Sequence, residues 1–252
     1  MPAFRHDGAL HWFAQVPRCA GSAVTAHLAA RFGPLAFHEP GRHGAERWTR
    51  TLPQVVTWSD LGHLVPEGWF ASCFAVVRHP LDRIVSVYND QAARQHRVAR
   101  GVAIDDWFEQ KLRAFRDDPY LLENHLRPQS AFVPEGAVCF RLEDGLEALG
   151  AWLDAHFGPA PDAPPLRQIR HELPRAAGFA PSAEVPNRLI RRVREVHGED
   201  YERFGYPMRP AAPPRLLAPA EAGPGRARLL RVTGSLRDRA RGLAARYTRP
   251  RR

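Results

Sequence analysis

The sequence predicts an α/β protein in which a central parallel sheet is flanked by helices in three layers. Three short apolar runs, at residues 10–16, 69–77 and 137–142, have the composition of buried strands. A parallel strand that is covered on both faces needs no polar alternation. Each run is followed by a segment with apolar residues at helical spacing, so strands and helices alternate along the chain.

Length and composition fit one globular protein. A chain of 252 residues can bury a sizeable core, and its 44% hydrophobic and 25% charged residues argue against disorder throughout. The sequence has neither an apolar run long enough to span a membrane nor a signal-peptide pattern at its start, so we expect a cytoplasmic protein.

The net charge of +9 is concentrated in one segment. Residues 226–252 contain ten arginines and one acidic residue, which leaves the other residues balanced at zero and argues against a folded body that binds nucleic acid. We expect a folded domain at 1–206, a Pro-rich linker at 207–225 and a basic tail at 226–252. The tail is either solvated or a helix that lies on an anionic membrane surface or an acidic partner.

The first apolar run leads into a loop of small residues, Pro17-Arg18-Cys19-Ala20-Gly21-Ser22-Ala23, and then into helical spacing at 24–31. Unpaired N–H groups at a helix N-terminus, together with the charge of Arg18, form a site for a phosphate-like anion. The alternative is a tight connection with no ligand. The lysine-containing loop of nucleoside triphosphatases is absent, and Thr25 stands where a cysteine phosphatase needs arginine.

The three cysteines form neither a pairing pattern nor a metal-ligand spacing, which fits a reducing compartment. Cys73 and Cys139 lie in apolar runs and are expected in the core. Cys19 has two interpretations. It is either a reactive thiol, with its pKa lowered by the helix N-terminus and Arg18, or a small residue of the loop.

The second apolar run ends at Arg78, just before Pro80 begins a helix. Arg78 therefore lies at the carboxyl end of a strand, where open α/β sheets bind ligands. Ser86 follows about two helical turns later. The alternative is that Arg78 forms a salt bridge at the helix end and that Ser86 serves only in packing.

Two further segments contain candidate site residues. The short segment 57–63 ends in Gly62-His63, and His63 is either a general base or a surface residue. Residues 124–130 are dense in hydrogen-bonding side chains, as expected for the wall of a site or for a surface loop.

The remaining pattern predicts helices and loops. Helical spacing is found at 104–115, 143–157 and 187–204, the last ending at Gly205. Residues 33–58 lack periodicity, and residues 158–186 contain seven prolines, so we expect long loops there that border the site.

Taken together, these segments resemble the sulfotransferases that use 3′-phosphoadenosine 5′-phosphosulfate (PAPS), and among them the carbohydrate-type sulfotransferase family 2. Residues 17–23 are similar to the P-K-T-[GA]-G-T-S loop of that family, and residues 77–88 to its V-R-[DNH]-P…S-x-Y segment. Shorter similarities follow the family order at Gly62-His63, His125 to Ser130, Arg141 to Asp144 and Glu199 to Tyr206. The resemblance covers residues 10–206. It departs from the family where Arg18 replaces the loop lysine and Cys19 the first threonine.

The resemblance implies a P-loop-like fold and an enzyme that transfers a sulfuryl group from PAPS to a hydroxyl, without a metal. It assigns the 5′-phosphosulfate to Arg18, Cys19, Ala20, Gly21, Ser22 and Ala23. Arg78 and Ser86 would bind the 3′-phosphate, a contact that arginine makes well. The catalytic residues would be His63, which takes the acceptor's proton, and Arg18, which contacts the leaving phosphate.

The resemblance favours a carbohydrate acceptor, with His125 and Gln129 as acceptor-binding residues. Three alternatives remain. In the first two, the acceptor is a small molecule or a lipid-linked group. In the third, the protein is a non-catalytic nucleotide-binding module whose basic tail drives association. A nucleotide kinase would need a lysine-containing triphosphate loop, which the sequence lacks.

Overall fold

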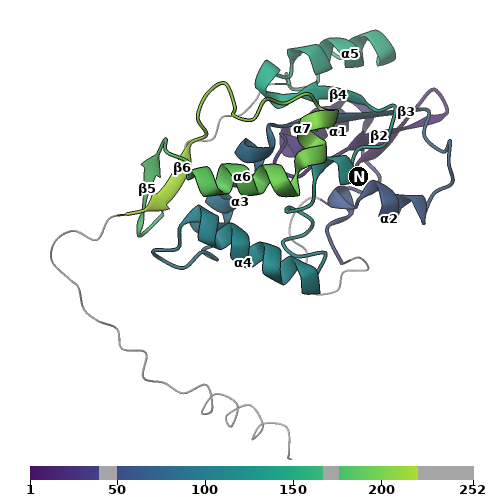
Figure 1. Cartoon of the computed structure of the whole chain (residues 1–252). Helices are drawn as coiled ribbons and strands as arrows, with labels where there is room; N and C mark the ends of the chain where they lie inside the picture. Colours follow the sequence, from purple (N-terminus) through teal and green to yellow (C-terminus); the bar gives the residue numbers. More distant parts are fainter. Residues whose placement is uncertain (40–49, 167–175, 221–252) are drawn as a thin grey trace, which may run out of the picture. The chain divides into compact units, whose positions relative to one another are not determined.

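The centre of the protein is a four-stranded sheet with the order β1-β2-β3-β4, seen in a computed structural model that describes residues 1–39, 50–166 and 176–220 (Figure 1). The strands are β1 (Ala3–His6), β2 (Ala9–Ala14), β3 (Ser72–Val77) and β4 (Val138–Arg141). β2, β3 and β4 run parallel, whereas β1 is antiparallel to β2. The predicted α/β class is confirmed, with a mixed sheet in place of a fully parallel one.

β1 was not predicted. Its sequence ends in Arg5-His6 and has no continuous apolar run, yet Ala3 and Phe4 are buried. The turn to β2 is Asp7-Gly8, with φ of 46° and 80°. Asp-Gly is a preferred dipeptide for a two-residue hairpin turn because such turns need positive φ. That dipeptide is the signal in the sequence from which the hairpin can be found.

Helices α1 (Gly21–Phe32) and α5 (Glu147–Phe157) cover one face of the sheet. Phe74 of β3 packs against Trp152 of α5 with ring centroids 5.2 Å apart, and the Arg31 guanidinium of α1 pairs with Asp154 of α5 at 2.7 Å. The other face carries the short helix α2 (Trp58–Gly62), where Trp12 stacks on Trp58 at 5.2 Å. Phe13, the neighbour of Trp12 in β2, stacks on Phe74 on the α5 side, so adjacent β2 residues point to opposite layers, as the period of a strand requires.

A second core, the helical core, consists of apolar residues of α3 (Pro80–Ala93), α4 (Ile104–Asp117) and α6 (Asn187–Val196). Within it the Tyr88 ring packs edge-on against Trp107 at 5.3 Å. α7 (Gly198–Arg203) follows α6 directly, and α3 packs against α4, α6 and β6. Short 3-10 turns lie at Pro53–Val55, Gln129–Ala131 and Leu142–Asp144.

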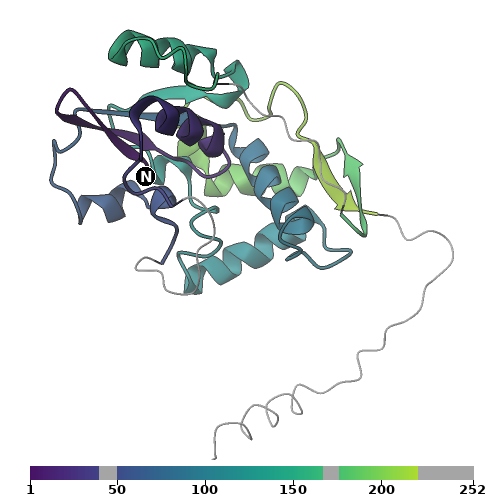
Figure 2. The same cartoon turned by 180° about the vertical axis from the view of Figure 1, so that it is seen from behind.

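A two-stranded antiparallel sheet joins β5 (Phe179–Ser182) to β6 (Leu216–Pro219) beside the helices (Figure 2). The Asn89 side chain of α3 holds β6 in place: its amide nitrogen donates to the Arg215 carbonyl at 2.7 Å, and its oxygen accepts from Leu217 N–H at 2.9 Å. The expected loop at 158–186 therefore contains one strand and the expected linker at 207–225 another. The folded body extends at least to Pro219, and the division into domain, linker and tail stays a prediction.

Three further expectations need correction. The strand at 137–142 exists as β4 but is not buried: Val138 is 40% exposed and Cys139 is exposed, because β4 is the edge of the sheet. Cys73, also expected in the core, is half-buried. The helix expected at 187–204 is two helices, interrupted at His197.

Parts of the predicted loops, at 40–49 and 167–175, and the basic segment 226–252 lie outside the described residues. Among the described residues, no helix combines the length and the apolar composition that crossing a membrane requires.

Replacing Phe74 by alanine is expected to reduce the free energy of unfolding by about 3–5 kcal/mol, because the ring is fully buried between β2 and α5. The matched control is Val138→Ala. Val138 is the register partner of Phe74 on β4 but is 40% exposed, so the change should stay within about 0.5 kcal/mol. Urea unfolding of both variants tests the burial pattern, and equal losses would contradict it.

Candidate active site

The loop between β2 and α1 has the backbone conformation of an anion cradle. Arg18 and Ala20 have φ of 68° and 58°, and Cys19 between them lies outside the positive-φ region. Such an alternation turns successive N–H groups toward one concavity. Gly21 and Ser22 open α1, so their N–H groups have no acceptor within the helix. Holding two non-glycine residues at positive φ costs about 1–3 kcal/mol each, which the surrounding structure must supply.

Arg18, Arg78 and Ser86 come together at the carboxyl ends of β2 and β3. The Arg18 guanidinium donates through Nε to Ser86 Oγ at 3.1 Å and through Nη1 to Asp90 Oδ1 at 3.2 Å. Arg78 Nη1 donates to the Arg18 carbonyl at 3.5 Å. Burial lowers the pKa of Arg18; Asp90 opposes this shift and Arg78 adds to it. The two predicted anion-binding segments therefore form one cluster.

Asp90 is a member of this cluster that sequence reasoning missed. It lies four residues after Ser86, so both side chains project from the same face of α3. The sequence alone did not single out Asp90, because a carboxylate nearly three turns into a helix is usually solvated. Here it is the partner that holds Arg18 on α3.

Cys19 is not a reactive thiol. Its side chain is fully buried, with Sγ 3.6 Å from the Pro17 carbonyl and 3.5 Å from Gln129 Oε1. Burial raises its pKa to about 12, against the opposing influence of Arg83 and Arg78. The thiol points under the loop and away from the helix N-terminus, so the expected lowering of its pKa is wrong and the interpretation as a small loop residue fits.

Gln129 supports the site from within the protein. It is fully buried, and its amide forms a reciprocal pair with the Arg78 backbone: Oε1 accepts from Arg78 N–H at 2.8 Å and Nε2 donates to the Arg78 carbonyl at 2.7 Å. Its own N–H donates to Asp200 Oδ2 at 2.8 Å. Gln129 thus positions Arg78, and its contact with an acceptor molecule stays a prediction.

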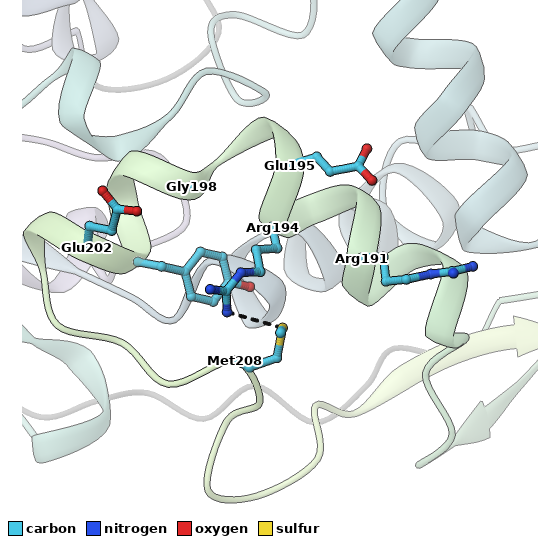
Figure 3. A pocket seen from close by; sticks show the side chains of 7 residues that line it. Arg191, Arg194, Glu195, Gly198, Glu202 and Met208 are labelled. Carbon is cyan, nitrogen blue, oxygen red and sulfur yellow. Dashed lines mark hydrogen bonds between the residues drawn. The ribbon is translucent and has the colours of Figure 1, made fainter.

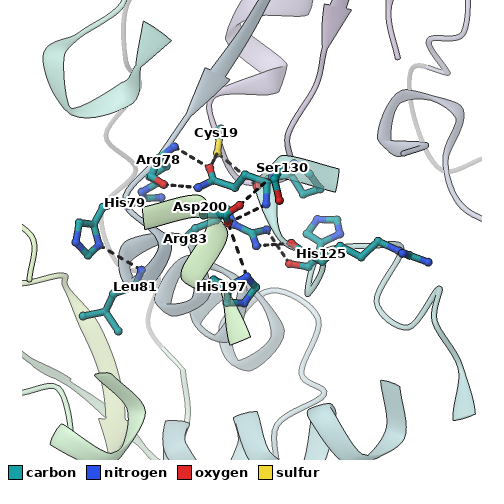
Figure 4. Close-up of polar contacts among 12 residues, drawn as sticks. Cys19, Arg78, His79, Leu81, Arg83, His125, Ser130, His197 and Asp200 are labelled. Atoms are coloured by element: carbon teal, nitrogen blue, oxygen red, sulfur yellow. Dashed lines mark hydrogen bonds and ion pairs between the residues drawn. The ribbon is translucent and has the colours of Figure 1, made fainter. Parts of the chain in front are cut away.

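A buried polar network supports this arrangement (Figure 4). Arg83 of α3 is fully buried and donates to the carbonyls of His125 and Arg127 at 3.0 and 2.5 Å. Asp200 of α7 accepts from the N–H groups of Gln129 and Ser130, and burial raises its pKa while Arg83 opposes the shift. The segment 125–130 is therefore fixed from both sides.

The two histidines predicted for the site lie in different environments. His125 is half-buried beside the network, and its pKa is lowered by burial and then by the charge of Arg18. His63 is exposed and caps the C-terminus of α2. No hydrogen bond or ion pair joins His63 to the Arg18 cluster within the described part of the chain, so its catalytic role stays a prediction.

A groove of about 390 Å³ lies elsewhere, between α6, α7 and Met208 (Figure 3). Arg194 Nη1 lies 3.4 Å from Met208 Sδ across it. None of the predicted site residues lines this groove.

In the described ranges, no group of three or more His, Cys, Asp or Glu side chains is placed to hold a metal ion.

Comparison with known families identifies the class of this protein. A family profile described as "Sulfotransferase family" matches residues 10–143, which is more than half of the chain. The chain therefore belongs to the sulfotransferase family, the class of enzymes that transfer a sulfuryl group to a hydroxyl-bearing acceptor. The matched region contains every predicted site residue from Arg18 to Gln129. Searches of curated proteins and of solved structures found no match.

The buried state of Cys19 predicts its reactivity. At pH 8 a thiol with a pKa of about 12 has about 10³-fold less thiolate than an ordinary one, so Cys19 should alkylate at least that much more slowly in the folded protein than in denaturant. Exposed Cys139 serves as the internal control. Mass spectrometry after iodoacetamide treatment resolves the sites, and labelling of Cys19 as fast as Cys139 would contradict its burial.

Proposed function

We propose that this protein transfers the sulfuryl group of PAPS to a saccharide hydroxyl. The observation that supports this proposal is the meeting of Arg18, Arg78 and Ser86 beside the anion cradle. PAPS has two anionic ends, a 5′-phosphosulfate and a 3′-phosphate. A cluster that combines two arginines and a hydroxyl with the cradle amides has donors for both ends of such a molecule, and the sulfotransferase family generally uses PAPS.

The proposed binding roles follow from the free donors of each residue. The N–H groups from Ala20 to Ser22 and the guanidinium of Arg18 bind the 5′-phosphosulfate. Nη2 of Arg18 makes no hydrogen bond within the described residues and is free to donate. Arg78 has a half-buried side chain that, within the described part of the chain, donates through Nη1 alone; it binds the 3′-phosphate with the Ser86 hydroxyl.

The reaction requires alignment, neutralised charge and a cation at the leaving oxygen, as phosphoryl transfer does. The acceptor oxygen forms a bond to sulfur while the bond from sulfur to the bridging phosphate oxygen breaks. The electron pair of that bond goes to the phosphate, and 3′-phosphoadenosine 5′-phosphate (PAP) leaves. Arg18 stabilises the charge that develops on this oxygen.

The saccharide acceptor rests on the resemblance to the carbohydrate-type enzymes. That resemblance assigns the acceptor's proton to His63 and an acceptor contact to His125. The proposed acceptor walls are the loops 33–58 and 158–186, of which residues 33–39, 50–58, 158–166 and 176–186 are described. A hydroxyl acceptor of another kind would use the same donor site.

PAP binding tests the donor site. At a concentration of 100 times its dissociation constant, PAP bound at one site stabilises the folded protein by about 2.7 kcal/mol, which raises Tm by about 5–10 °C. Arg78→Ala should abolish most of this shift, because it removes the cation proposed for the 3′-phosphate. Arg113→Ala, which removes an exposed arginine of α4, should keep it. A shift with ATP and none with PAP would refute the proposal.

Arg18 variants test the leaving-group contact. Arg18→Ala should reduce kcat about 10²–10³-fold, the cost of removing one donor that stabilises transition-state charge. Arg18→Lys retains the charge, as a compact ammonium in place of a planar fork, and should recover part of the rate. Both variants have a side chain at the same positive φ, so their backbone strain is comparable. An alanine variant within about threefold of the unaltered protein would contradict this role.

A further inference from the structure

The groove between α6, α7 and Met208 continues along α6. The hollow of about 390 Å³ shares Arg191 and Met208 with a second hollow of about 460 Å³, which Asn187, Ile190 and Arg209 also line. Met208 is 45% exposed and belongs to both hollows. The two hollows therefore form one groove along the helix, the α6 groove.

Helix α6 divides its arginines between two faces. Arg188 and Arg192, one helical turn apart, form ion pairs with carboxylates of α4 at 3.0–3.4 Å. Arg191 and Arg194 line the α6 groove instead, and neither forms an ion pair with a described residue. Because cations without counterions repel one another, their grouping beside a groove favours the binding of an anion from outside the chain.

The contacts of these arginines leave donors free for a ligand. Arg194 Nη1 donates to Met208 Sδ at 3.4 Å. A thioether sulfur is a weak acceptor, so this guanidinium loses little when it turns to an anionic oxygen. Arg209 enters the groove from the segment after α7, and Asn187 Oδ1 accepts from its Nη2 at 2.8 Å. Three guanidiniums thus line the groove with N–H groups that no described residue uses.

The hydroxyl of Tyr201 is a buried donor without an acceptor. Tyr201 lines the α6 groove and is 5% exposed, and its hydroxyl has no hydrogen-bond partner among the described residues. Burial raises the pKa of Tyr201 to about 12, against the opposing charge of Arg194, so the hydroxyl stays protonated at neutral pH. A buried donor without a partner costs free energy, which a ligand oxygen at this position would recover.

The carboxylates of the groove do not neutralise its cationic end. Glu195 is paired with Arg192 at 2.7 Å. Figure 3 shows Glu202 and Arg191 at opposite ends of the groove, with Met208 between them. An anion is therefore attracted to the end that carries the arginines and repelled from the end that carries Glu202.

We infer that the α6 groove binds a sulfate group through Arg191, Arg194 and Arg209, as a second anion site that is separate from the donor site. A tetrahedral oxyanion suits several guanidiniums and a hydroxyl better than a planar carboxylate does, because its oxygens point in more directions. The inference rests on the proposed function, from which the ligand is a sulfate ester that the saccharide chain already carries. The groove binds this group and makes or breaks no bond.

Helix α7 separates the α6 groove from the donor site. Asp200 of α7 accepts from the N–H groups of residues 129–130, whereas the next residue, Tyr201, lines the groove. The Tyr201 ring packs edge-on against His79, which directly follows Arg78, with centroids 5.5 Å apart. The groove uses none of the residues proposed for PAPS, so a saccharide bound there does not compete with PAPS for a side chain.

Methionine-methyl NMR tests the α6 groove directly, because the chain has only two methionines, buried Met1 and exposed Met208. The full chain with ¹³C-methyl methionine is titrated separately with inorganic sulfate, a chondroitin 4-sulfate tetrasaccharide and an unsulfated chondroitin tetrasaccharide. We expect the Met208 signal to shift to saturation with the first two, and Kd to be at least about tenfold lower for the sulfated tetrasaccharide than for either other probe.

Each other outcome of this titration contradicts a part of the inference. A Met208 signal that none of the probes moves would overturn the site. Equal Kd values for inorganic sulfate and the sulfated tetrasaccharide would overturn the saccharide as the source of the sulfate. Equal Kd values for the two tetrasaccharides would overturn the sulfate as the recognised group.

Two matched double variants remove the same charge from the same helix. Arg191→Gln with Arg194→Gln takes away two groove donors and should raise Kd for the sulfated tetrasaccharide at least about tenfold. Arg188→Gln with Arg192→Gln removes the arginines that pair with α4 and should leave Kd within about threefold. All four side chains are exposed or half-buried, so both variants are expected to fold. Equal effects would assign the binding to net charge alone and overturn the site.

The PAP-induced rise in Tm separates this test from the test of the proposed function. If PAP gives no rise while the Met208 shift saturates, the donor site of the proposed function fails and the groove stands as an anion site. If PAP gives the rise and the Met208 signal does not move, only the groove fails.

Discussion

The buried guanidinium of Arg83 is the constraint on which the site depends. A cation without solvent needs acceptors within the protein, and Arg83 finds them for Nη1 and Nη2 in the carbonyls of His125 and Arg127, whereas its Nε has no hydrogen-bond partner among the described residues. Burial lowers its pKa, and the nearby carboxylate of Asp200 opposes this effect. The segment 125–130 cannot move away from α3 without leaving a charge unpaired. One helix residue therefore fixes a loop that has no regular structure of its own.

Gln129 connects this buried network to the sheet. Through its side chain it binds both backbone groups of Arg78 at the end of β3, and its oxygen also lies 3.5 Å from Cys19 Sγ under the first loop. The loops that follow β2 and β3 thus both contact the side-chain amide of Gln129. These buried contacts of Gln129 hold the residues that face a ligand in one geometry, which catalysis of a group transfer requires.

The sequence predicted the parts of the fold that depend on local pattern. β2 and β3 were found because strands buried on both faces have continuous apolar runs, and Arg78 and Ser86 were found because strand and helix meet at Pro80. The directions of side chains were not predictable. Whether Cys19 points into the cradle or beneath it depends on Gln129, which lies far along the chain.

The burial of β4 and the turn before His125 were not predictable from the sequence either. The apolar composition of 137–142 indicates a strand, but only the sheet order shows that β4 is an edge strand. The left-handed turn at 122–124 contains no glycine, so its sequence gives no sign of positive φ. The Asn124 side chain holds it in place by donating to the Val55 carbonyl of a distant segment and accepting from Arg127, three residues along the chain.

The single face of α3 that carries Arg83, Ser86 and Asp90 also has a consequence for how such a chain can diverge. Each helical residue turns the side-chain direction by about 100°. A one-residue insertion between Arg83 and Ser86 would leave every side chain present, yet it would rotate the residues that hold Arg18 away from the one that holds His125. The spacing of Arg83, Ser86 and Asp90 along the helix is therefore more strictly constrained than the identity of many core residues.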